Sequence, residues 1–230
     1  LLPVWSMTLN IYVPDRKTQD QRALGRAKVN ATRQVTKLVN EIGSLLRSWG
    51  IILECSLLSK KGQQRIEEAK AQLPEHSLKV LVLWLAMLEQ AQEAERELDA
   101  AIRKEAEQDS NCKLLMSIPG VGPFTALVVS AEIGDIRRFP SAAHLISYCG
   151  LSPSVSQSAD KIYYCKLNRF CNRYLRYVLV LRGCGAARLR GENPLKKTYW
   201  RVAIKNHLND AKIALSRQLV RALHSILKSG

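Results

Sequence analysis

Three short segments in the second half of the chain carry residue types that act on nucleic acid. They are a glycine-rich turn at 118–123, a polar stretch containing Ser158, and a basic segment at 172–176. Glycines let a backbone approach a phosphate closely, and a serine hydroxyl attacks a phosphodiester when a base or metal takes its proton. Together the segments predict a domain that handles DNA. No cluster of carboxylates accompanies Ser158 in the sequence.

The segment 115–126 has the pattern of a helix-hairpin-helix motif, with Pro-Gly-apolar-Gly between two helices. We expect Gly120, Val121 and Gly122 to bind DNA, because the N–H groups that open the second helix then point at a phosphate. This contact reads no base sequence. A tight turn that binds nothing would use the same residues, but the basic charge of the domain favours DNA binding.

Ser158 is the candidate catalytic nucleophile. A serine in a polar loop is usually only a loop residue, and Ser154 and Ser156 compete with it. The cations that follow favour a catalytic role, because they bind a phosphate and stabilise charge at an attacked phosphoryl centre. The expected DNA-binding residues here are Lys161, Lys166, Arg169, Asn172, Arg173 and Arg176. We expect the three arginines to share one helix face. Asp160 is a candidate base, or simply a solvated loop residue.

Positive charge is concentrated in the second half of the chain. Residues 111–230 hold 19 Lys and Arg against 5 Asp and Glu, whereas residues 1–110 hold 16 against 15. This asymmetry favours a polyanionic partner, and DNA over an anionic membrane surface or a merely solvated basic face. Aromatic residues interleave with the cations, and they either stack on exposed bases or pack between helices.

The cysteine and histidine spacing argues against a metal site. The six cysteines form no C-x-x-C pair, and the four histidines do not cluster with them. We expect reduced thiols, a cytoplasmic location, no membrane partner and no cofactor held by this chain. The longest apolar run, 78–88, is too short to span a bilayer.

The first half of the chain predicts two long helices. Leu24, Lys28, Ala31, Val35, Leu38, Ile42, Leu45 and Trp49 follow a 4-3-4-3 spacing in which only Lys28 is polar. A helix from 77 to 108 carries a weaker seam that includes Glu95, and a short helix is expected at 63–72. The pattern predicts an antiparallel coiled-coil arm, or an ordinary bundle packed on the second domain.

The predicted fold is mostly α, with a long antiparallel helical arm followed by a helical domain that contains the helix-hairpin-helix. Beyond 110 we expect helices at 112–117, 124–133, 140–149, 167–190, 194–206 and 209–228, with a loop at 150–165. The predicted parts are a remnant of an upstream domain at 1–14, a coiled-coil connector at 15–110, and the DNA-handling domain at 111–230.

Residues 113–228 resemble the C-terminal domain of the IS-one-ten class of insertion-sequence transposases. The shared elements occur in order at 118–123, 131–135, 138–142, 148–153, 157–159, 165–173 and 175–176. The chain departs from the family pattern where Ala159 follows the serine and where Cys165 and Cys171 replace glycines. Residues 14–110 fit the connector of the family more loosely.

The resemblance implies that Ser158 is the nucleophile that joins covalently to DNA. It also implies an upstream RuvC-like domain whose four acids bind magnesium, a structured non-coding guide RNA, and assembly as homo-oligomers. We expect this chain to be truncated, and alone to bind DNA without transposing it. The alternatives are a non-catalytic helix-hairpin-helix DNA-binding protein and a purely structural coiled-coil module.

The charge asymmetry predicts that residues 111–230 bind DNA and residues 1–110 do not. The affinity of the second half should fall steeply with salt, with a log–log slope of about −0.9 per phosphate neutralised. Titration of duplex DNA with each half, expressed separately, measures this. Equal binding by the two halves would contradict it.

Overall fold

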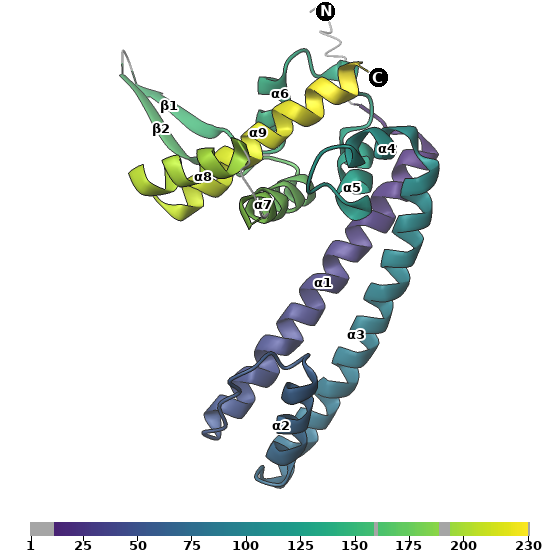
Figure 1. Cartoon of the computed structure of the whole chain (residues 1–230), viewed down its shortest axis with the longest axis vertical. Helices are drawn as coiled ribbons and strands as arrows, with labels where there is room; N and C mark the ends of the chain where they lie inside the picture. The colour runs from purple at the N-terminus through teal and green to yellow at the C-terminus, as the bar shows by residue number, and fades with distance from the viewer. Residues whose placement is uncertain (1–11, 159–160, 189–193, 230) are drawn as a thin grey trace, which may run out of the picture. The chain divides into compact units, whose positions relative to one another are not determined.

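The structure is a computed structural model that describes residues 12–158, 161–188 and 194–229. The mostly α fold expected from the sequence is confirmed (Figure 1). The chain divides into two compact units. We name residues 24–110 the arm unit, and residues 12–23 with 111–229 the basic unit. None of the described helices is long and apolar enough to cross a membrane.

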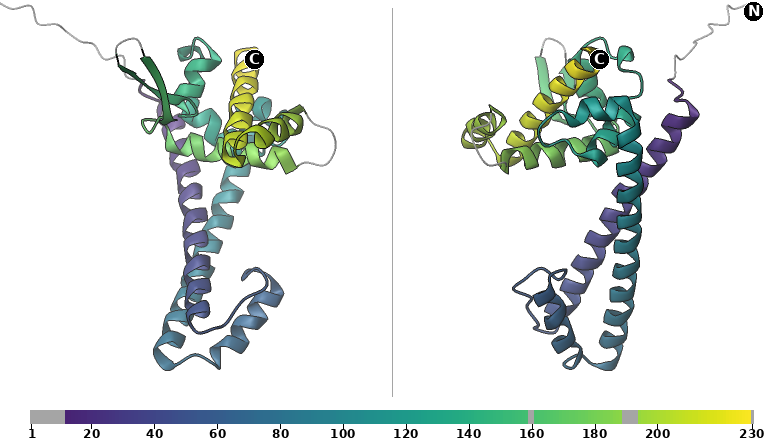
Figure 2. Two further views of the ribbon diagram at one scale, coloured as in Figure 1. Left: turned by 90° about the vertical axis from the view of Figure 1, so that its left-hand side faces the viewer. Right: turned by 45° about the vertical axis from the view of Figure 1, so that its right-hand side comes forward.

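The arm unit is built from α1 (Arg16–Ser48), α2 (Lys60–Lys70) and α3 (Glu75–Gln108), with α1 contributing its residues from 24 onward. Helices α1 and α3 run alongside one another (Figures 1 and 2). Between the helices lies a core to which α1 contributes Val35, Leu38, Ile42 and Leu46. Gly50 follows α1 with φ at +74°, a conformation that glycine adopts without strain and that ends helices.

The predicted apolar seam of α1 holds only in part. Leu46 is fully buried in place of Leu45, and Trp49 is half-exposed with its indole N–H donating to the Ser77 hydroxyl. A straight α-helix has 3.6 residues per turn, so a strict 3.5-residue spacing drifts off the packed face towards its end.

The two polar positions in the predicted seams meet each other. The Lys28 ammonium lies 2.9 Å from Glu95 Oε1 and 2.8 Å from Asp99 Oδ2, and the Thr32 hydroxyl donates to Glu95 Oε1 at 2.6 Å. Lys28 is only 7% exposed, so the charge is taken out of water and needs these partners. The pair therefore specifies how α1 and α3 align.

The basic unit contains the remaining elements in chain order. These are α4 (Ser110–Met116), α5 (Pro123–Ile133), the 3₁₀ turn η1 (Ile136–Arg138), α6 (Ala142–Tyr148), β1 (Pro153–Ser158), β2 (Lys161–Leu167), α7 (Arg173–Arg188), α8 (Pro194–Lys205) and α9 (Leu208–Ser229). Every residue of α5 from 125 to 133 is buried, so α5 is the centre of this unit. The apolar stripe of α9 at Leu215, Leu219 and Leu223 is buried, as its spacing predicts.

The predictions of a loop at 150–165 and of a helix from 167 were wrong. Strands β1 and β2 pair antiparallel there, with Val155 opposite Tyr164 and Ser158 opposite Lys161 (Figure 1). β-Branched and aromatic residues such as Val155 and Ile162 suit extended strands. Helix α7 begins six residues later than predicted, because the Asn172 side chain caps it by accepting from the Leu175 N–H at 3.0 Å.

The buried Lys28 pair makes a prediction about stability. Lys28→Met leaves Glu95 without its cation and should lower the free energy of unfolding by about 2 kcal/mol. Lys37→Met is the matched control, because Lys37 is exposed and its i,i+4 pair with Glu41 contributes about 0.5 kcal/mol or less. Urea unfolding of the full chain near neutral pH measures both. Equal losses in the two variants would contradict this role.

Urea unfolding in mild acid tests whether the ionised Glu95 carboxylate stabilises the fold. Burial acts to raise the pKa of Glu95, but hydrogen bonds from Thr32 and Lys28 outweigh it and hold the pKa below its ordinary value. The stability from this carboxylate is therefore present above its unfolded pKa and is lost as the pH falls through the folded pKa. This acid loss should be smaller in Lys28→Met.

Candidate nucleic-acid interface

The glycine turn before α5 is open on its outer side. Gly120 has φ at +87° and is exposed, whereas Gly122 has ordinary extended dihedrals and forms the N-cap of α5 ahead of Pro123. A Cβ added at either glycine would meet no atom within 4 Å. Val121 is buried and its N–H donates to the Ile118 carbonyl. The turn is thus anchored by Val121 and leaves space beside the two glycines, where an anion can approach the N-terminus of α5.

Arg182 is a cation at this turn that the sequence analysis missed. Its Nε donates to the Thr125 hydroxyl in the first turn of α5 at 2.7 Å, and it lines a small hollow with Pro119 and Gly120. The only local signal is a single arginine that follows the apolar run 178–181. The guanidinium and the positive end of the α5 dipole both favour an anion at this place.

Ser158 is the last residue of β1, and its Cα partner in β2 is Lys161. The β-hairpin extends away from the helices of the basic unit (Figure 1). Since β1 starts at Pro153, shortly after α6, and ends at Ser158, Ser158 lies towards the outer end of the hairpin. The side chains of Ser158, Lys161 and Ser156, and all of Asp160, lie outside the described residues. The Ser154 hydroxyl donates to the Lys166 carbonyl at 2.9 Å, which gives it a role inside the hairpin.

The predicted shared helix face of Arg169, Arg173 and Arg176 is not formed. Arg169 lies in the loop 168–172, outside α7, because the Asn172 cap starts the helix at Arg173. Arg169 and Arg173 are exposed. The Arg176 guanidinium turns inward and donates to the Asn168 carbonyl. The structure therefore leaves two of the three arginines available to a ligand and uses the third to hold the loop.

Asn172 also faces inward, although its position in the basic segment led us to expect DNA binding. Its Nδ2 donates to Glu132 Oε2 at 2.7 Å, while its Oδ1 caps α7. Glu132 is 1% exposed, and its Oε2 lies 3.7 Å from Arg22 Nε. In this structure Asn172 positions the start of α7 and the loop before it.

A cleft of about 1050 Å³ lies between the base of the β-hairpin and helices α7 to α9. Its lining includes three cations, Lys166, Lys212 and Arg217, and the carboxylate of Asp210. Leu167, Val180 and Val202 provide an apolar part of its wall. Cations beside apolar surface fit a phosphate attached to a base or sugar. Of the predicted site residues whose side chains the structure describes, only Lys166 lines this cleft.

Helix α8 adds an exposed basic face to the same unit. Arg201 and Lys205 are exposed one turn apart, next to the exposed Trp200 and Ile204. Trp200 is one of the aromatic residues that interleave with the cations in the sequence, where either stacking on bases or packing between helices was expected. In the structure its side chain is 52% exposed, which is compatible with stacking on a base.

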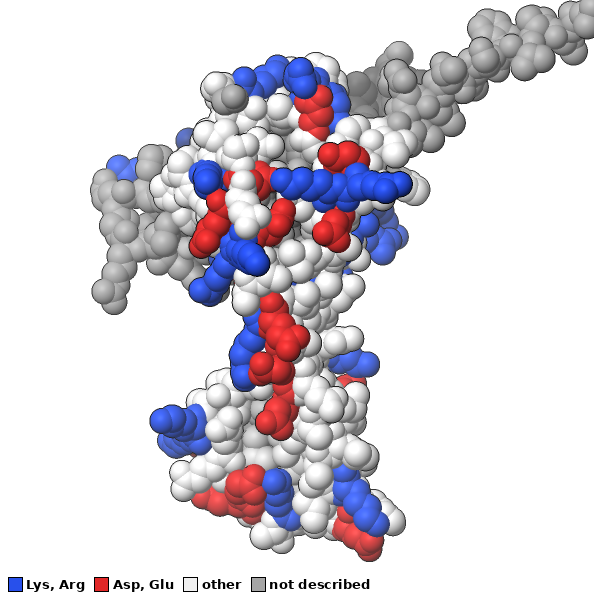
Figure 3. Space-filling model, turned by 90° about the vertical axis from the view of Figure 1, so that its right-hand side faces the viewer, with Lys and Arg blue, Asp and Glu red and all other residues white. Residues whose placement is uncertain are grey.

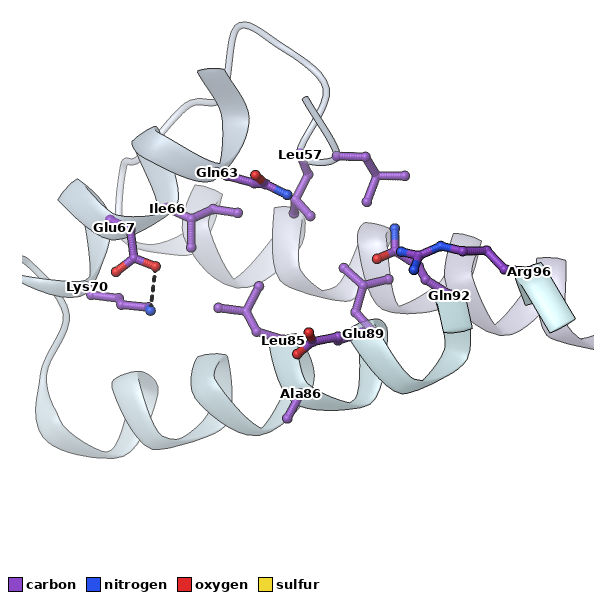
Figure 4. Close-up of a pocket in the computed structure, with 12 residues that line it drawn as sticks. Leu57, Gln63, Ile66, Glu67, Lys70, Leu85, Ala86, Glu89, Gln92 and Arg96 are labelled. Carbon is purple, nitrogen blue, oxygen red and sulfur yellow. Dashed lines mark hydrogen bonds and ion pairs between the residues drawn. The ribbon is translucent and has the colours of Figure 1, made fainter. Parts of the chain in front are cut away.

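The arm unit has a different electrostatic character. On the face in Figure 3, acidic and basic side chains lie next to each other along its helices. A hollow of about 470 Å³ between α2 and α3 is lined by apolar groups and by charges that pair, such as Lys70 with Glu67 at 2.7 Å (Figure 4). With cations neutralised in this way, the arm hollow does not match a polyanion.

The described residues contain no group of three or more histidine, cysteine or acidic side chains that could hold a metal ion. Cys149 is not a candidate metal ligand either. Burial and the nearby Cys171 raise the pKa of its thiol far above the ordinary value, and the charge of Arg176 opposes this only in part. A protonated buried thiol is a poor nucleophile and metal ligand. The arrangement thus supports binding of a phosphate backbone, with Ser158 as the candidate reacting group.

Part of the basic unit is similar to a family of transposases. Residues 112–201 match the protein family described as Transposase IS116/IS110/IS902 family. This match includes the glycine turn, the β-hairpin with Ser158, and the loop 168–172. The match covers these residues alone, so it does not test the RuvC-like acidic domain that the resemblance implies.

Individual relatives carry names that agree with this family. The chain is 35% identical over 60% of its length to the IS110 insertion element 43.6 kDa protein of Streptomyces coelicolor. It is 27% identical over 91% to the IS1111A transposase of Coxiella burnetii, and 26% identical over 95% to a putative transposase of Sinorhizobium fredii. The chain spans 34%, 58% and 58% of the lengths of these three relatives.

The adjacent residues Asn172 and Arg173 give a matched pair of variants. Asn172→Ala removes a cap and a hydrogen bond to a buried carboxylate, so it should lower the free energy of unfolding by about 1–2 kcal/mol. Arg173→Ala should change it by about 0.5 kcal/mol or less, yet reduce the salt slope of DNA binding by about 1. Urea unfolding and DNA titration over a salt series test both. Loss of stability in Arg173→Ala with unchanged binding would reverse the two roles.

Proposed function

We propose that this chain is the connector and C-terminal DNA-handling part of a DNA transposase, in which Ser158 forms the covalent link to DNA. The observation that carries the proposal is the placement of Ser158 towards the outer end of a β-hairpin whose second strand leads directly into the exposed Arg169 and Arg173. The match of residues 112–201 to a transposase family supports it.

The chemistry is a pair of phosphoryl transfers. The Ser158 oxygen attacks a backbone phosphorus, its own proton leaves to a base, and the departing DNA oxygen takes up a proton as the P–O bond breaks. A hydroxyl of a second DNA strand then attacks the same phosphorus and gives up its proton to a base. The bond between phosphorus and the serine oxygen breaks, and that oxygen takes up a proton, so the strands are joined and the Ser158 hydroxyl is restored. No net oxidant or energy source is needed, because one phosphodiester replaces another.

In this proposal the proton on Ser158 goes to a group of another domain. The described residues do not fit a magnesium site, since no three potential ligands gather. We place magnesium in the RuvC-like acidic domain, where it would lower the pKa of a coordinated hydroxyl. A serine on a projecting hairpin suits an active site completed by another domain.

In this proposal, different cations of the basic unit bind different phosphates of the DNA backbone. The glycine turn, with the α5 N-terminus and Arg182, takes one backbone phosphate without reading sequence. The cleft with Lys166, Lys212 and Arg217 takes a second stretch of backbone. Arg169, in the loop before α7, and Arg173, the first residue of α7, follow the end of the hairpin opposite Ser158 and bind phosphates further along the same backbone.

The arm unit is proposed as the oligomerisation element. Val82, Leu83 and Met87 on α3 are about half-exposed or more, so they present apolar surface that a second copy would cover. Oligomers would allow one copy to supply acids to the Ser158 of another. A structured non-coding RNA that selects the DNA is part of the same proposal and rests on the family resemblance.

A non-catalytic helix-hairpin-helix DNA-binding protein is the second candidate function. The contact between Arg182 and Thr125 at the glycine turn favours it, because that site holds a phosphate without any contribution from Ser158. The two candidates differ only in covalent chemistry, and the next experiment separates them.

We expect no covalent DNA adduct from this chain alone with magnesium. We expect one when an intact relative supplies the acidic domain and guide RNA, and we expect Ser158→Ala to abolish it. Ser154→Ala is the matched control, since its hydroxyl already serves the hairpin. A denaturing gel with labelled element-end DNA measures the adduct. An adduct that survives Ser158→Ala would move the nucleophile elsewhere, and its absence in every mixture would favour the second candidate.

A further inference from the structure

Phe170 is the most exposed large apolar side chain among the described residues, with 93% of its surface accessible. It stands in the loop 168–172 between β2 and α7, next to Arg169 and three residues before Arg173. A phenylalanine held in water forgoes the burial that normally stabilises it, so a ligand that covers its ring gains that free energy.

The loop beneath Phe170 is held on both sides. The Asn168 N–H donates to the Ser152 carbonyl at 3.1 Å, and its side-chain oxygen accepts from the Phe170 N–H at 2.9 Å. The Arg176 guanidinium donates to the Asn168 carbonyl, and the Asn172 N–H donates to the Tyr148 carbonyl. The backbone therefore presents the ring outward in a fixed position, which reduces the ordering cost when a ligand binds.

The charge around Phe170 indicates what covers it. Both Arg169 and Arg173 are exposed, and the sequence from 161 to 191 contains no aspartate or glutamate. Glu132, an acid that the fold brings to this loop, is buried and bonded to Asn172. An aromatic ring between two exposed cations fits a ligand that alternates flat rings with phosphates, and fits an apolar protein surface poorly.

We propose that Phe170 is a wedge that stacks on an unpaired or opened base of the bound DNA, while Arg169 and Arg173 bind the phosphates on either side. This inference rests on the proposed DNA-handling function and deepens it. Apolar side chains that enter a base step unstack it locally and bend the duplex. Phe170 follows the end of the hairpin opposite Ser158, so the bend that it causes would direct the DNA along the hairpin towards the serine.

The test compares two labelled duplexes of the same sequence, one fully paired and one with a single bulged base. The full chain should bind the bulged duplex roughly tenfold more tightly, because one exposed base is ready to stack. Phe170→Ala should remove this preference and leave the salt slope unchanged, since no charge is altered. Phe170→Trp should keep the preference, because it keeps an aromatic face.

Ile204→Ala is the matched control, because Ile204 is 81% exposed on α8 of the same unit but has no ring. It should keep the preference for the bulge. Arg169→Ala should lower the salt slope by about 1 on both duplexes and keep the preference. The melting temperature of Phe170→Ala should match the parent, since its side chain packs against little.

Three results would overturn the proposal that Phe170 stacks on a base. One is DNA binding by the parent chain without preference for the bulge, and another is a preference that survives Phe170→Ala. The third is a change of oligomeric state in Phe170→Ala, measured by light scattering, with the preference intact, since the ring would then contact a second copy. In each of these the salt-dependent DNA binding stands. Absence of DNA binding by the parent would remove the proposed function and the wedge together.

Discussion

The buried carboxylate of Glu132 is the contact on which the candidate site depends. At 1% exposure it lies at the end of the central helix α5, and it accepts a hydrogen bond from Asn172. Arg22 stands beside it and donates to the backbone carbonyls of Ala131 and Glu132 at 2.7 and 3.1 Å. A buried charge without partners costs several kcal/mol, so these contacts hold three distant segments together. Through the Asn172 cap, Glu132 determines where α7 begins.

The start of α7 in turn decides which basic residues face a ligand. Because the helix opens at Arg173, the loop 168–172 is left outside it and is tied down by Arg176. Arg169, Phe170 and Arg173 then point outward from a fixed base, directly after the strand that pairs with Ser158. Hydrogen bonds among buried polar groups thus position the exposed side chains of the loop. A stable scaffold can hold a ligand-binding loop in this way.

The two units place charge in opposite ways. Residues 24–110 hold equal numbers of basic and acidic side chains, and the polar pair Lys28 with Glu95 is used inside the helix packing. In the basic unit cations far outnumber acids, since residues 111–230 hold 19 Lys and Arg against 5 Asp and Glu. This division agrees with the proposal that one unit recognises a polyanion and that the other, with the exposed apolar residues of α3, packs against a second copy.

Local patterns in the sequence determined most helices, the stop at Gly50, the core stripe of α9 and the concentration of positive charge, because these depend on residues close together in the chain. The β-hairpin escaped prediction, since its pairing joins residues across a turn and its alternation is weak. Arg182, Arg22 and the inward turn of Asn172 and Arg176 also escaped, because a side chain's partner in another segment has no local signature. Only the tertiary structure decided which cations bond to other parts of the fold and which stay exposed on the surface together with Phe170.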